Sequence, residues 1–411
     1  MKQKTTRSSK QVRDKKLLQE LRDERALLNQ HSGDKEARRF RRLLGKIRLE
    51  KPKFWWQDRN LLQKLGIILA VIVILFVGSA YGIARWYIAT QAHKEFKFGA
   101  TFIPRYARYF ELEPETTMQA MIDNLGIRHF RLVSYWDEFE KSPGNYDFRE
   151  LDWQFEKVKQ AGGTVSLTLG LRQPRWPECH MPNWHKDKPM DQWYPSLKKY
   201  IGVVIDRYKD HPSLDTYQLE NEFFLKVFGI CPDHSRERLV DEYKFVKEKD
   251  PNTPVIVTRS NNAWGWPINE PIPDISGVSV YKRVWDKTLT KRYFEYPFPA
   301  WFYGFLAGGT KIVTGRDLII HELQTESWGP DKGIKEMTID EQNQSLNAER
   351  LRDRIRYGKA TGMREIDLWG VESWYWRKTR MNDPSLWDAG KAAIREQQCY
   401  DCYLPRDSVL E

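Results

Sequence analysis

From about residue 96 to the end of the chain, short apolar, β-prone stretches alternate with longer stretches whose apolar residues recur at helical spacing. The first pattern is typical of strands and the second of amphipathic helices. The alternation predicts helices at residues 114–125, 149–161, 195–208, 235–249 and 339–361. It predicts eight strands, at residues 96–102, 128–133, 164–169, from 216 onward, 254–258, 277–281, 317–322 and 365–369.

Strands that alternate with helices indicate parallel βαβ units. Eight such units over roughly 300 residues match the size of a (β/α)8 TIM barrel. The competing architecture is a doubly wound open sheet, which usually carries a Gly-rich phosphate turn after its first strand. Gly99-Ala100-Thr101-Phe102 is not such a turn. The predicted fold class is therefore α/β, a (β/α)8 barrel over residues 89–395.

Residues 294–309 form an unusually aromatic stretch. Three interpretations are open: the stretch lines a cleft, rests on a membrane surface, or packs as the sixth barrel helix. Packing is the default expectation, because aromatic side chains most often contribute buried area.

Before the predicted barrel lies a run of 20 residues without a formal charge, from Leu65 to Ala84, closed off by Lys64 and Arg85. A helix of about 20 residues spans about 30 Å, the thickness of the hydrocarbon core of a bilayer. A buried core helix rarely needs so long an apolar run, and a cleaved signal peptide has a shorter one. Residues 65–88 are predicted to be a transmembrane signal-anchor helix. The aromatic residues Trp55, Trp56, Trp86 and Tyr87 flank its uncharged run, where amphipathic rings favour the membrane interface.

The basic excess of the chain lies entirely before this helix. Residues 1–64 hold 20 Lys and Arg against 8 Asp and Glu, whereas residues 65–411 hold 47 against 48. A basic flank favours the cytoplasmic side of the membrane. The expectation is a single-pass protein of the cell (plasma) membrane, with a cytoplasmic N-terminus and an extracytoplasmic barrel. The balanced charge of the barrel gives no support for a nucleic-acid partner.

Within the basic helical segment, Phe40, Leu43, Leu44 and Ile47 recur at helical spacing among Arg and Lys residues. This pattern fits a helix that lies on an anionic membrane, so that membrane lipid would contact both the basic segment and the transmembrane helix. A short partner-binding helix or a solvated basic tail fits the pattern equally well.

Two strand ends carry carboxylates of catalytic type. Asn221-Glu222 follows the strand that starts at residue 216, and Glu322 ends the strand at residues 317–322. (β/α)8 enzymes place their chemistry at the C-terminal ends of barrel strands. Hydrolysis of a glycosidic bond needs one carboxyl group to protonate the leaving oxygen and another to attack or to activate water. Glu220 and Glu326 are alternative candidates for the two catalytic carboxylates. A further alternative is that all of these are ordinary structural carboxylates paired with Arg or Lys.

These residues resemble a large clan of retaining glycoside hydrolases built on (β/α)8 barrels, the cellulase-, xylanase- and β-glycosidase-like enzymes. In that clan Asn-Glu ends strand four and a second Glu ends strand seven. Further matches, each weak alone, are an Arg on strand two, a Tyr at the end of strand six and a Trp after strand eight, which correspond to Arg131, Tyr281 and Trp374.

The resemblance implies that Glu222 is the general acid/base and Glu322 the nucleophile, with Asn221 on the sugar 2-hydroxyl group. It implies that Arg131 and Tyr281 contact Glu322 and that Trp374 floors the sugar site. The implied substrate is a polysaccharide or oligosaccharide, without a cofactor. The segment from Gln173 to Glu178, which contains Trp176, is the best candidate for a substrate loop. Alternatives are transglycosylation by the same carboxylates, a catalytically inactive glycan-binding barrel, and a scaffold that works through its cytoplasmic segment.

The four cysteines, Cys179, Cys231, Cys399 and Cys402, all fall in the part predicted to be extracytoplasmic. Cys179 and Cys231 follow neighbouring strands, which favours a disulfide between them. Cys399 and Cys402, in the C-terminal tail at 396–411, have the spacing of a local bridge, of a zinc ligand pair or of a redox pair. Because there is no second CxxC and no HExxH, the expectation is disulfides and no metal.

Overall fold

A computed structural model describes residues 59–226, 229–260, 270–286, 290–330 and 332–396. The chain divides into two compact units, Met1–Ile74 and Leu75–Glu411. Helix α3, Leu61–Gln91, contains the predicted membrane span and is long and apolar enough to cross a bilayer. The predictions for the basic segment before residue 59 and for Cys399 and Cys402 lie outside the described residues.

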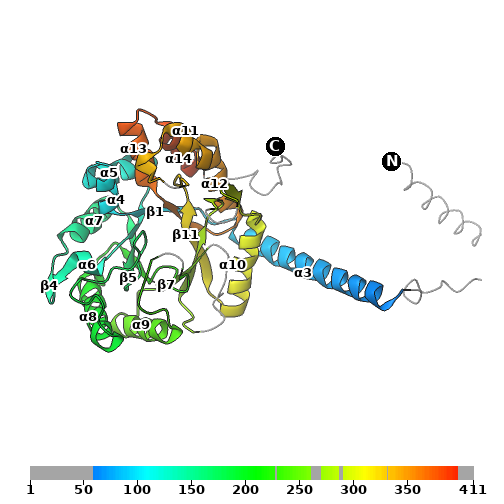
Figure 1. Ribbon diagram of the computed structural model, residues 1–411, viewed down its shortest axis with the longest axis horizontal. Helices are drawn as coiled ribbons and strands as arrows, with labels where there is room; N and C mark the ends of the chain where they lie inside the picture. The colour runs from blue at the N-terminus through cyan, green and yellow to red at the C-terminus, as the bar shows by residue number, and fades with distance from the viewer. Residues whose placement is uncertain (1–58, 227–228, 261–269, 287–289, 331, 397–411) are drawn as a thin grey trace, which may run out of the picture. The chain divides into compact units, whose positions relative to one another are not determined.

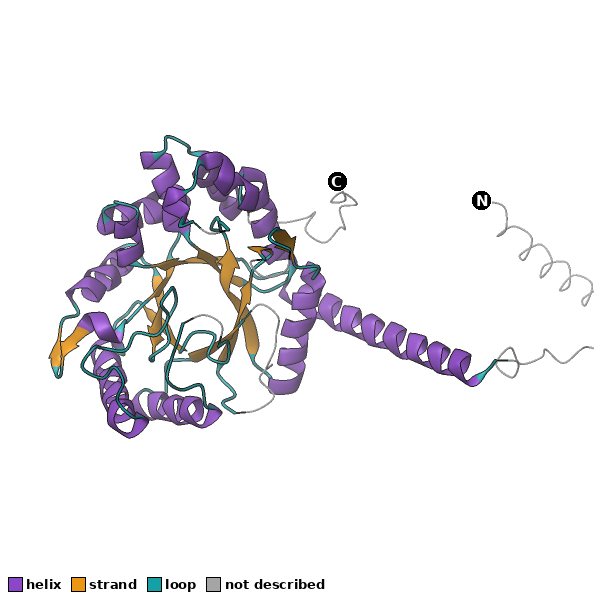
Figure 2. Cartoon of the chain, in the orientation of Figure 1, coloured by secondary structure: helices purple, strands orange, loops and turns teal. Residues whose placement is uncertain are grey.

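The described strands of the second unit confirm the predicted barrel. Eight parallel strands close on themselves in the order β1-β12-β11-β8-β7-β6-β5-β2, and Figure 2 shows them as a ring enclosed by helices. The barrel strands are β1 Lys97–Phe102, β2 His129–Leu132, β5 Thr164–Leu169, β6 Leu214–Leu219, β7 Val255–Arg259, β8 Ile275–Val280, β11 Asp317–Gln324 and β12 Glu365–Trp369.

Helices surround the barrel and pack their apolar faces on it (Figure 1). Short α4 and α5 follow β1, and α13 and α14 follow β12. The bounds are α4 Pro104–Tyr109, α5 Pro114–Ala120 with the π turn Met121–Leu125, α6 Trp136–Phe139, α7 Arg149–Gln160, α8 Met190–Tyr208, α9 Arg236–Lys249, α10 Ala300–Thr314, α11 Ile339–Ser345, α12 Ala348–Ala360, α13 Val371–Arg380 and α14 Ser385–Arg395. Two small hairpins, β3 Glu140–Ser142 with β4 Asn145–Tyr146 and β9 Arg283–Trp285 with β10 Tyr293–Glu295, lie outside the barrel.

The single helix predicted at residues 339–361 is wrong, because the chain forms two helices there. Leu346 adopts an extended conformation with φ −144° and ends α11. The side chain of Asn347 then accepts a hydrogen bond from the Arg350 backbone N–H and caps α12. Asn at such a position stabilises a helix start by about 1 kcal/mol. The apolar periodicity continues across the break, which is why periodicity alone does not reveal it.

The aromatic stretch contributes a barrel helix, as expected by default. Helix α10 starts only at Ala300, because Pro299 occupies its N-cap position. Tyr303, Leu306 and Ala307 are buried.

Within the second unit, α10 also packs against the end of α3. A Cβ added at Gly308 would lie 2.8 Å from Ile83 Cγ2, and one at Gly304 would lie 3.3 Å from Ile88 Cδ1. The two glycines therefore permit the close approach, and Tyr87 and Ile88 are buried. Residues at the end of α3 are thus part of the folding unit of the barrel.

The interior of the barrel is unusually polar. Barrels of this type are generally filled by branched apolar side chains. Here Lys97 Nζ on β1 reaches Asp215 Oδ2 on β6 at 2.6 Å, and Arg131 Nη2 on β2 reaches Glu322 Oε1 on β11 at 2.7 Å. These contacts join strands that are not neighbours in the barrel, so the charged side chains lie inside it.

The predicted disulfide is confirmed: Cys179 and Cys231 are bonded, in the segments after β5 and β6. The bridge closes a loop with a sequence separation of 52. A crosslink of this kind stabilises a fold by about 2–4 kcal/mol, mainly by restricting the unfolded chain. We expect the Cys179→Ser/Cys231→Ser variant to unfold at a lower temperature, and reductant to lower the Tm of the wild type but not of the variant. An equal Tm in all four samples would contradict the expectation.

Candidate active site

A cavity of about 300 Å³ lies at the C-terminal ends of the barrel strands. Its walls carry four carboxylates, several aromatic rings and one Arg. The lining residues are Arg175, Trp176, Glu178, Asn221, Glu222, Ser260, Tyr281, Val284, Tyr296, Glu322, Glu326, Trp328 and Trp369. Both predicted catalytic carboxylates therefore share one cavity with Asn221, Tyr281 and Trp176.

The chain turns sharply at the end of β6, where Glu220 and Glu222 both have positive φ angles, 56° and 42°. Such angles are uncommon for residues other than Gly and are retained where the surroundings fix them. The Glu222 backbone N–H donates to Thr258 Oγ1 at 2.9 Å. Glu222 lines the cavity, whereas the carboxylate of Glu220 accepts hydrogen bonds from the Leu171 backbone N–H and from Arg238, both at 2.8 Å. Glu220 thus has a structural role.

Glu322 is held by two donors. Arg131 Nη2 donates to Oε1 at 2.7 Å, and the Tyr281 hydroxyl group donates to Oε2 at 2.8 Å. Burial and the charge of Glu322 raise the pKa of Tyr281 well above its usual value, so the phenol keeps its proton and remains a donor. The guanidinium group and the phenol together fix the position of the Glu322 carboxylate.

A bulge in β11 explains why two consecutive residues both reach the interior. Ile320 pairs with Val278, but Glu322 pairs with the next residue, Ser279, so β11 contains one extra residue at this point. Consecutive residues of a regular strand point to opposite faces, and a bulge re-aims them. His321 is consequently buried beside Glu322, with Nε2 3.9 Å from Glu322 Oε1. Burial and the charge of Arg131 lower the pKa of His321 well below its usual value, which keeps the imidazole neutral.

Glu222 experiences the opposite environment. Burial, and then the charge of Glu322, raise its pKa to about 8, although a hydrogen bond from the Ser279 hydroxyl group acts in the other direction. A carboxylate oxygen of Glu222, one of Glu322 and a ring nitrogen of His321 all lie within 4.8 Å of one another. The site therefore holds one carboxyl group that favours its proton close to another that is ion-paired.

Asn221 and Arg131 connect the two carboxylates. Arg131 Nη2 also donates to Asn221 Oδ1 at 3.2 Å, and Nη1 donates to the carbonyl oxygen of His321 at 2.7 Å. Gln218 Nε2 is a second donor to Asn221 Oδ1, at 3.2 Å. With Oδ1 used in this way, Asn221 presents its NH2 group as the donor for a ligand.

The two predicted tryptophans have different surroundings. Trp176 lies at the cavity with 68% of its surface exposed. Trp374 is 0% exposed and its Nε1 donates to the Thr325 carbonyl oxygen at 2.6 Å, so the prediction that it floors the site is wrong. Trp374 lies inside α13, whereas Trp369, the last residue of β12, lines the cavity.

Several side chains of the cavity have no role that the sequence predicts. Glu326, considered only as an alternative catalytic residue, accepts a hydrogen bond from the Tyr106 hydroxyl group and pairs with Arg175 at 3.3 Å. The Arg175 guanidinium group lies over the Tyr106 ring, 3.4 Å from its centre. Glu178 pairs with Arg172 Nη2 at 2.6 Å, and burial raises the pKa of Glu178 to about 7. Glu178 does belong to the predicted substrate loop, but nothing in its spacing distinguishes it.

Glu222, His321 and Glu322 are also close enough to be considered as metal ligands. Both oxygens of Glu322, however, already accept hydrogen bonds, Oε1 from Arg131 and Oε2 from Tyr281, which leaves neither of them free for a cation. The arrangement suits proton transfer and nucleophilic attack better than metal binding.

No protein-family model matches the chain, and no curated protein matches it. Among solved structures, it is similar to an endo-β-1,4-xylanase of glycoside hydrolase family 10 from Gloeophyllum trabeum, at 13% identity over 74% of this chain and 97% of that chain, with a TM-score of 0.48. It is also similar to xylanase 10C from Cellvibrio japonicus in complex with xylopentaose, at 14% identity over 75% and 69%, with a TM-score of 0.49. A β-galactosidase from Halorubrum lacusprofundi matches at 14% identity over 66% and 52%, with a TM-score of 0.46. The chain thus spans about half the length of that β-galactosidase.

Proposed function

We propose that the chain is a membrane-anchored retaining glycoside hydrolase that cleaves O-glycosidic bonds of an extracytoplasmic glycan. One observation carries the proposal: Glu222 favours its protonated form, and Glu322 is ion-paired with Arg131, with their oxygens within 4.8 Å. Retaining enzymes place their carboxyl groups about 5–5.5 Å apart, whereas inverting enzymes leave room for a water molecule with about 6.5–9.5 Å.

In the first step, a Glu322 oxygen attacks the anomeric carbon while Glu222 gives its proton to the leaving glycosidic oxygen. The glycosidic bond breaks and a glycosyl ester on Glu322 forms. In the second step, Glu222, now ionised, takes a proton from water, whose oxygen attacks the anomeric carbon and releases Glu322. Asn221 would donate to the 2-hydroxyl group of the sugar. Trp176, Trp328 and Trp369 provide aromatic surface around it.

The anchoring part of the proposal rests on α3 and on the charge distribution. The helix is apolar over the length needed to span a bilayer, and the excess of basic over acidic residues lies before its apolar run. We propose a cytoplasmic N-terminus and an extracytoplasmic barrel. A reporter fused after Glu411 that is active only in the cytoplasm should give no signal, and a strong signal would overturn this topology.

The function is tested with the full-length chain in detergent, because residues of α3 are buried in the folding unit of the barrel. The protein is incubated with a panel of α- and β-linked polysaccharides and aryl glycosides, and product release is measured. We expect turnover of at least one substrate, abolished in both Glu222→Gln and Glu322→Gln. Binding without turnover, unchanged in both variants, would instead indicate a glycan-binding barrel. Products with new linkages would indicate transglycosylation.

The raised pKa of Glu222 sets the alkaline limit of activity. The general acid must be protonated, and its pKa is about 8, so kcat/KM should fall as the pH rises above about 8. The Ser279 hydroxyl group donates to the carboxylate and thereby favours its ionised form. We expect Ser279→Ala to raise the pKa and move the alkaline limb of the kcat/KM profile to higher pH. A limb that moves to lower pH would contradict this role of Ser279.

A further inference from the structure

A second cluster of titratable side chains lies at the opposite, N-terminal end of the barrel. His129 is the first residue of β2, and Glu365 and Asp367 are the first and third residues of β12. His129 Nε2 lies 3.6 Å from Glu365 Oε1 and 3.9 Å from Asp367 Oδ1. One possible ligand atom from each of the three residues lies within 4.8 Å of the other two.

Each of the three atoms is buried and has no hydrogen-bond partner. His129 and Asp367 are each 1% exposed. Buried polar atoms in folded proteins are generally paired with protein groups, water or ions, so these three neighbouring unpaired atoms are available to a bound ion. The other ring nitrogen of His129, Nδ1, lies 2.8 Å from Thr164 Oγ1. A hydrogen bond at Nδ1 orients the ring and leaves Nε2 to offer its lone pair, as for histidines that bind metal ions.

The formal charges beside the cluster are predominantly negative. Lys97 Nζ pairs with Asp215 Oδ2 at 2.6 Å and with Glu365 Oε2 at 3.0 Å. One ammonium group thus stands against the carboxylates of Asp215, Glu365 and Asp367. The formal side-chain charges of these four residues sum to −2, a balance that a divalent ion would neutralise.

The neighbouring strand leaves space for this cluster. Gly99 of β1 pairs with Asp367 on one side and with His129 on the other. A Cβ at position 99 would lie 2.0 Å from Asp367 Oδ1 and 2.7 Å from His129 Cδ2. Glycine at this position therefore lets the side chains of β12 and β2 meet across β1.

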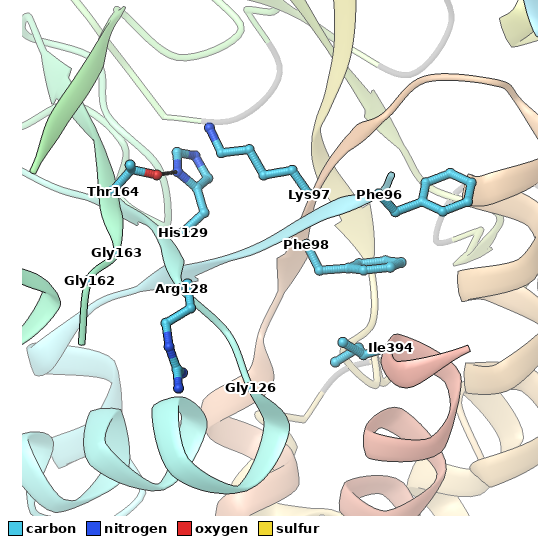
Figure 3. A pocket seen from close by; sticks show the side chains of 10 residues that line it. All are labelled: Phe96, Lys97, Phe98, Gly126, Arg128, His129, Gly162, Gly163, Thr164 and Ile394. Atoms are coloured by element: carbon cyan, nitrogen blue, oxygen red, sulfur yellow. Dashed lines mark hydrogen bonds between the residues drawn. The ribbon is translucent and has the colours of Figure 1, made fainter. Parts of the chain in front are cut away.

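A surface cavity adjoins the His129 side of the cluster. A cavity of about 230 Å³ is lined by Lys97, His129 and Thr164, among other residues. In Figure 3 the side chains of Lys97 and His129 point to the same side of their strands, whereas Arg128 points away from them.

We propose that His129, Glu365 and Asp367 form a binding site for a divalent transition-metal ion of the zinc class. Imidazole with two carboxylates suits zinc better than calcium or magnesium, which prefer oxygen ligands alone. Metal–ligand bonds of about 2.0–2.2 Å in a tetrahedral site correspond to ligand atoms roughly 3.3–3.6 Å apart, so the observed 3.6 and 3.9 Å require only a small contraction. The ion would link β12 to β2 across β1 and so join the last strand of the barrel to the first two.

The proposal is tested on the full-length chain in detergent, purified without a histidine tag. The protein is loaded with Zn²⁺, freed of weakly bound ion by gel filtration, and its metal content is measured. We expect about one ion per chain in the wild type. In Asp367→Asn and in His129→Gln the retained metal content should be lower by roughly tenfold or more, because each lost ligand weakens the site. Asp215→Asn, which alters a neighbouring carboxylate outside the ligand set, should keep the ion.

Glu322→Gln separates this site from the catalytic cluster and should also keep the ion. Equal metal content in wild type and Asp367→Asn, or loss of the ion in Glu322→Gln, would overturn the proposal. A measurement on the wild type tests the proposal even if the variants fail to fold. X-ray absorption of the Co²⁺-loaded protein should show one imidazole among oxygen ligands. A spectrum without imidazole would overturn the proposal. The Tm of the wild type should rise on adding Zn²⁺, and that of Asp367→Asn should not.

Discussion

Replacing Glu322 by Gln or Gly should lower kcat by about 10⁴-fold or more, equivalent to about 5.5 kcal/mol of transition-state stabilisation. The loss of kcat is large because the covalent intermediate cannot form without the nucleophile. The remaining groups of the site cannot replace it. The interactions of Glu322 with Arg131 and Tyr281, at 2.7 and 2.8 Å, hold the attacking oxygen in place. Loss of the side chain leaves those donors without their acceptor.

Azide distinguishes a lost nucleophile from a damaged fold. In Glu322→Gly the space left by the carboxylate should admit azide, which attacks the anomeric carbon in its place and restores turnover of an activated aryl glycoside. The matched control is Glu326→Gly, which removes another carboxylate of the same cavity. Glu326 is held by Tyr106 and Arg175, and its loss should lower activity without azide rescue. Rescue of Glu326→Gly instead would make Glu326 the nucleophile.

Replacing Glu222 by Gln should have an effect that depends on the leaving group. A substrate with a poor leaving group needs the proton, and general acid catalysis contributes about 10²–10⁴-fold. A dinitrophenyl glycoside needs no proton in the first step, so its rate of glycosyl-enzyme formation should change little. Pre-steady-state measurement of phenol release for a series of aryl glycosides provides the comparison.

Glu178→Gln is the control for this second prediction, because Glu178 also lines the cavity with its pKa raised to about 7. Its pairing with Arg172 suggests that it shapes the loop after β5. We expect Glu178→Gln to lower the rates of all substrates by similar factors. A steep dependence on the leaving group in Glu178→Gln, and none in Glu222→Gln, would reverse the roles of the two residues.

The sequence was sufficient to predict the barrel, because each strand is a short buried run between amphipathic helices. All eight predicted strands occur, with ends within a few residues of those observed. The break at Leu346 was not predictable from apolar periodicity. The helix ends and restarts at Leu346 and Asn347, but the spacing of apolar residues continues unchanged across these two positions. The prediction for Trp374 was wrong for a similar reason. A motif gives only the order of residues along the chain, whereas the turn into α13 determines which aromatic ring faces the cavity.

The candidate site was predictable where a residue stands at a strand end, as Glu222 and Glu322 do. It was not predictable where a side chain arrives from another part of the chain, as Ser279 does at Glu222. The bulge in β11 that turns both His321 and Glu322 inward has no signature in the sequence. The proximity of His129, Glu365 and Asp367 was also not predictable, since these residues share no local spacing and meet only through the register around Gly99.

The anomeric configuration of the first product tests the central claim, that Glu222 and Glu322 form a retaining pair. Hydrolysis of the best aryl glycoside is followed by proton NMR with the full-length chain, and the anomeric signals are recorded before mutarotation proceeds. The account predicts that the sugar released first has the same configuration as the substrate, because two displacements at one carbon restore it. Initial release of the opposite anomer would contradict it, since that outcome requires a single attack by water and leaves Glu322 no role as nucleophile.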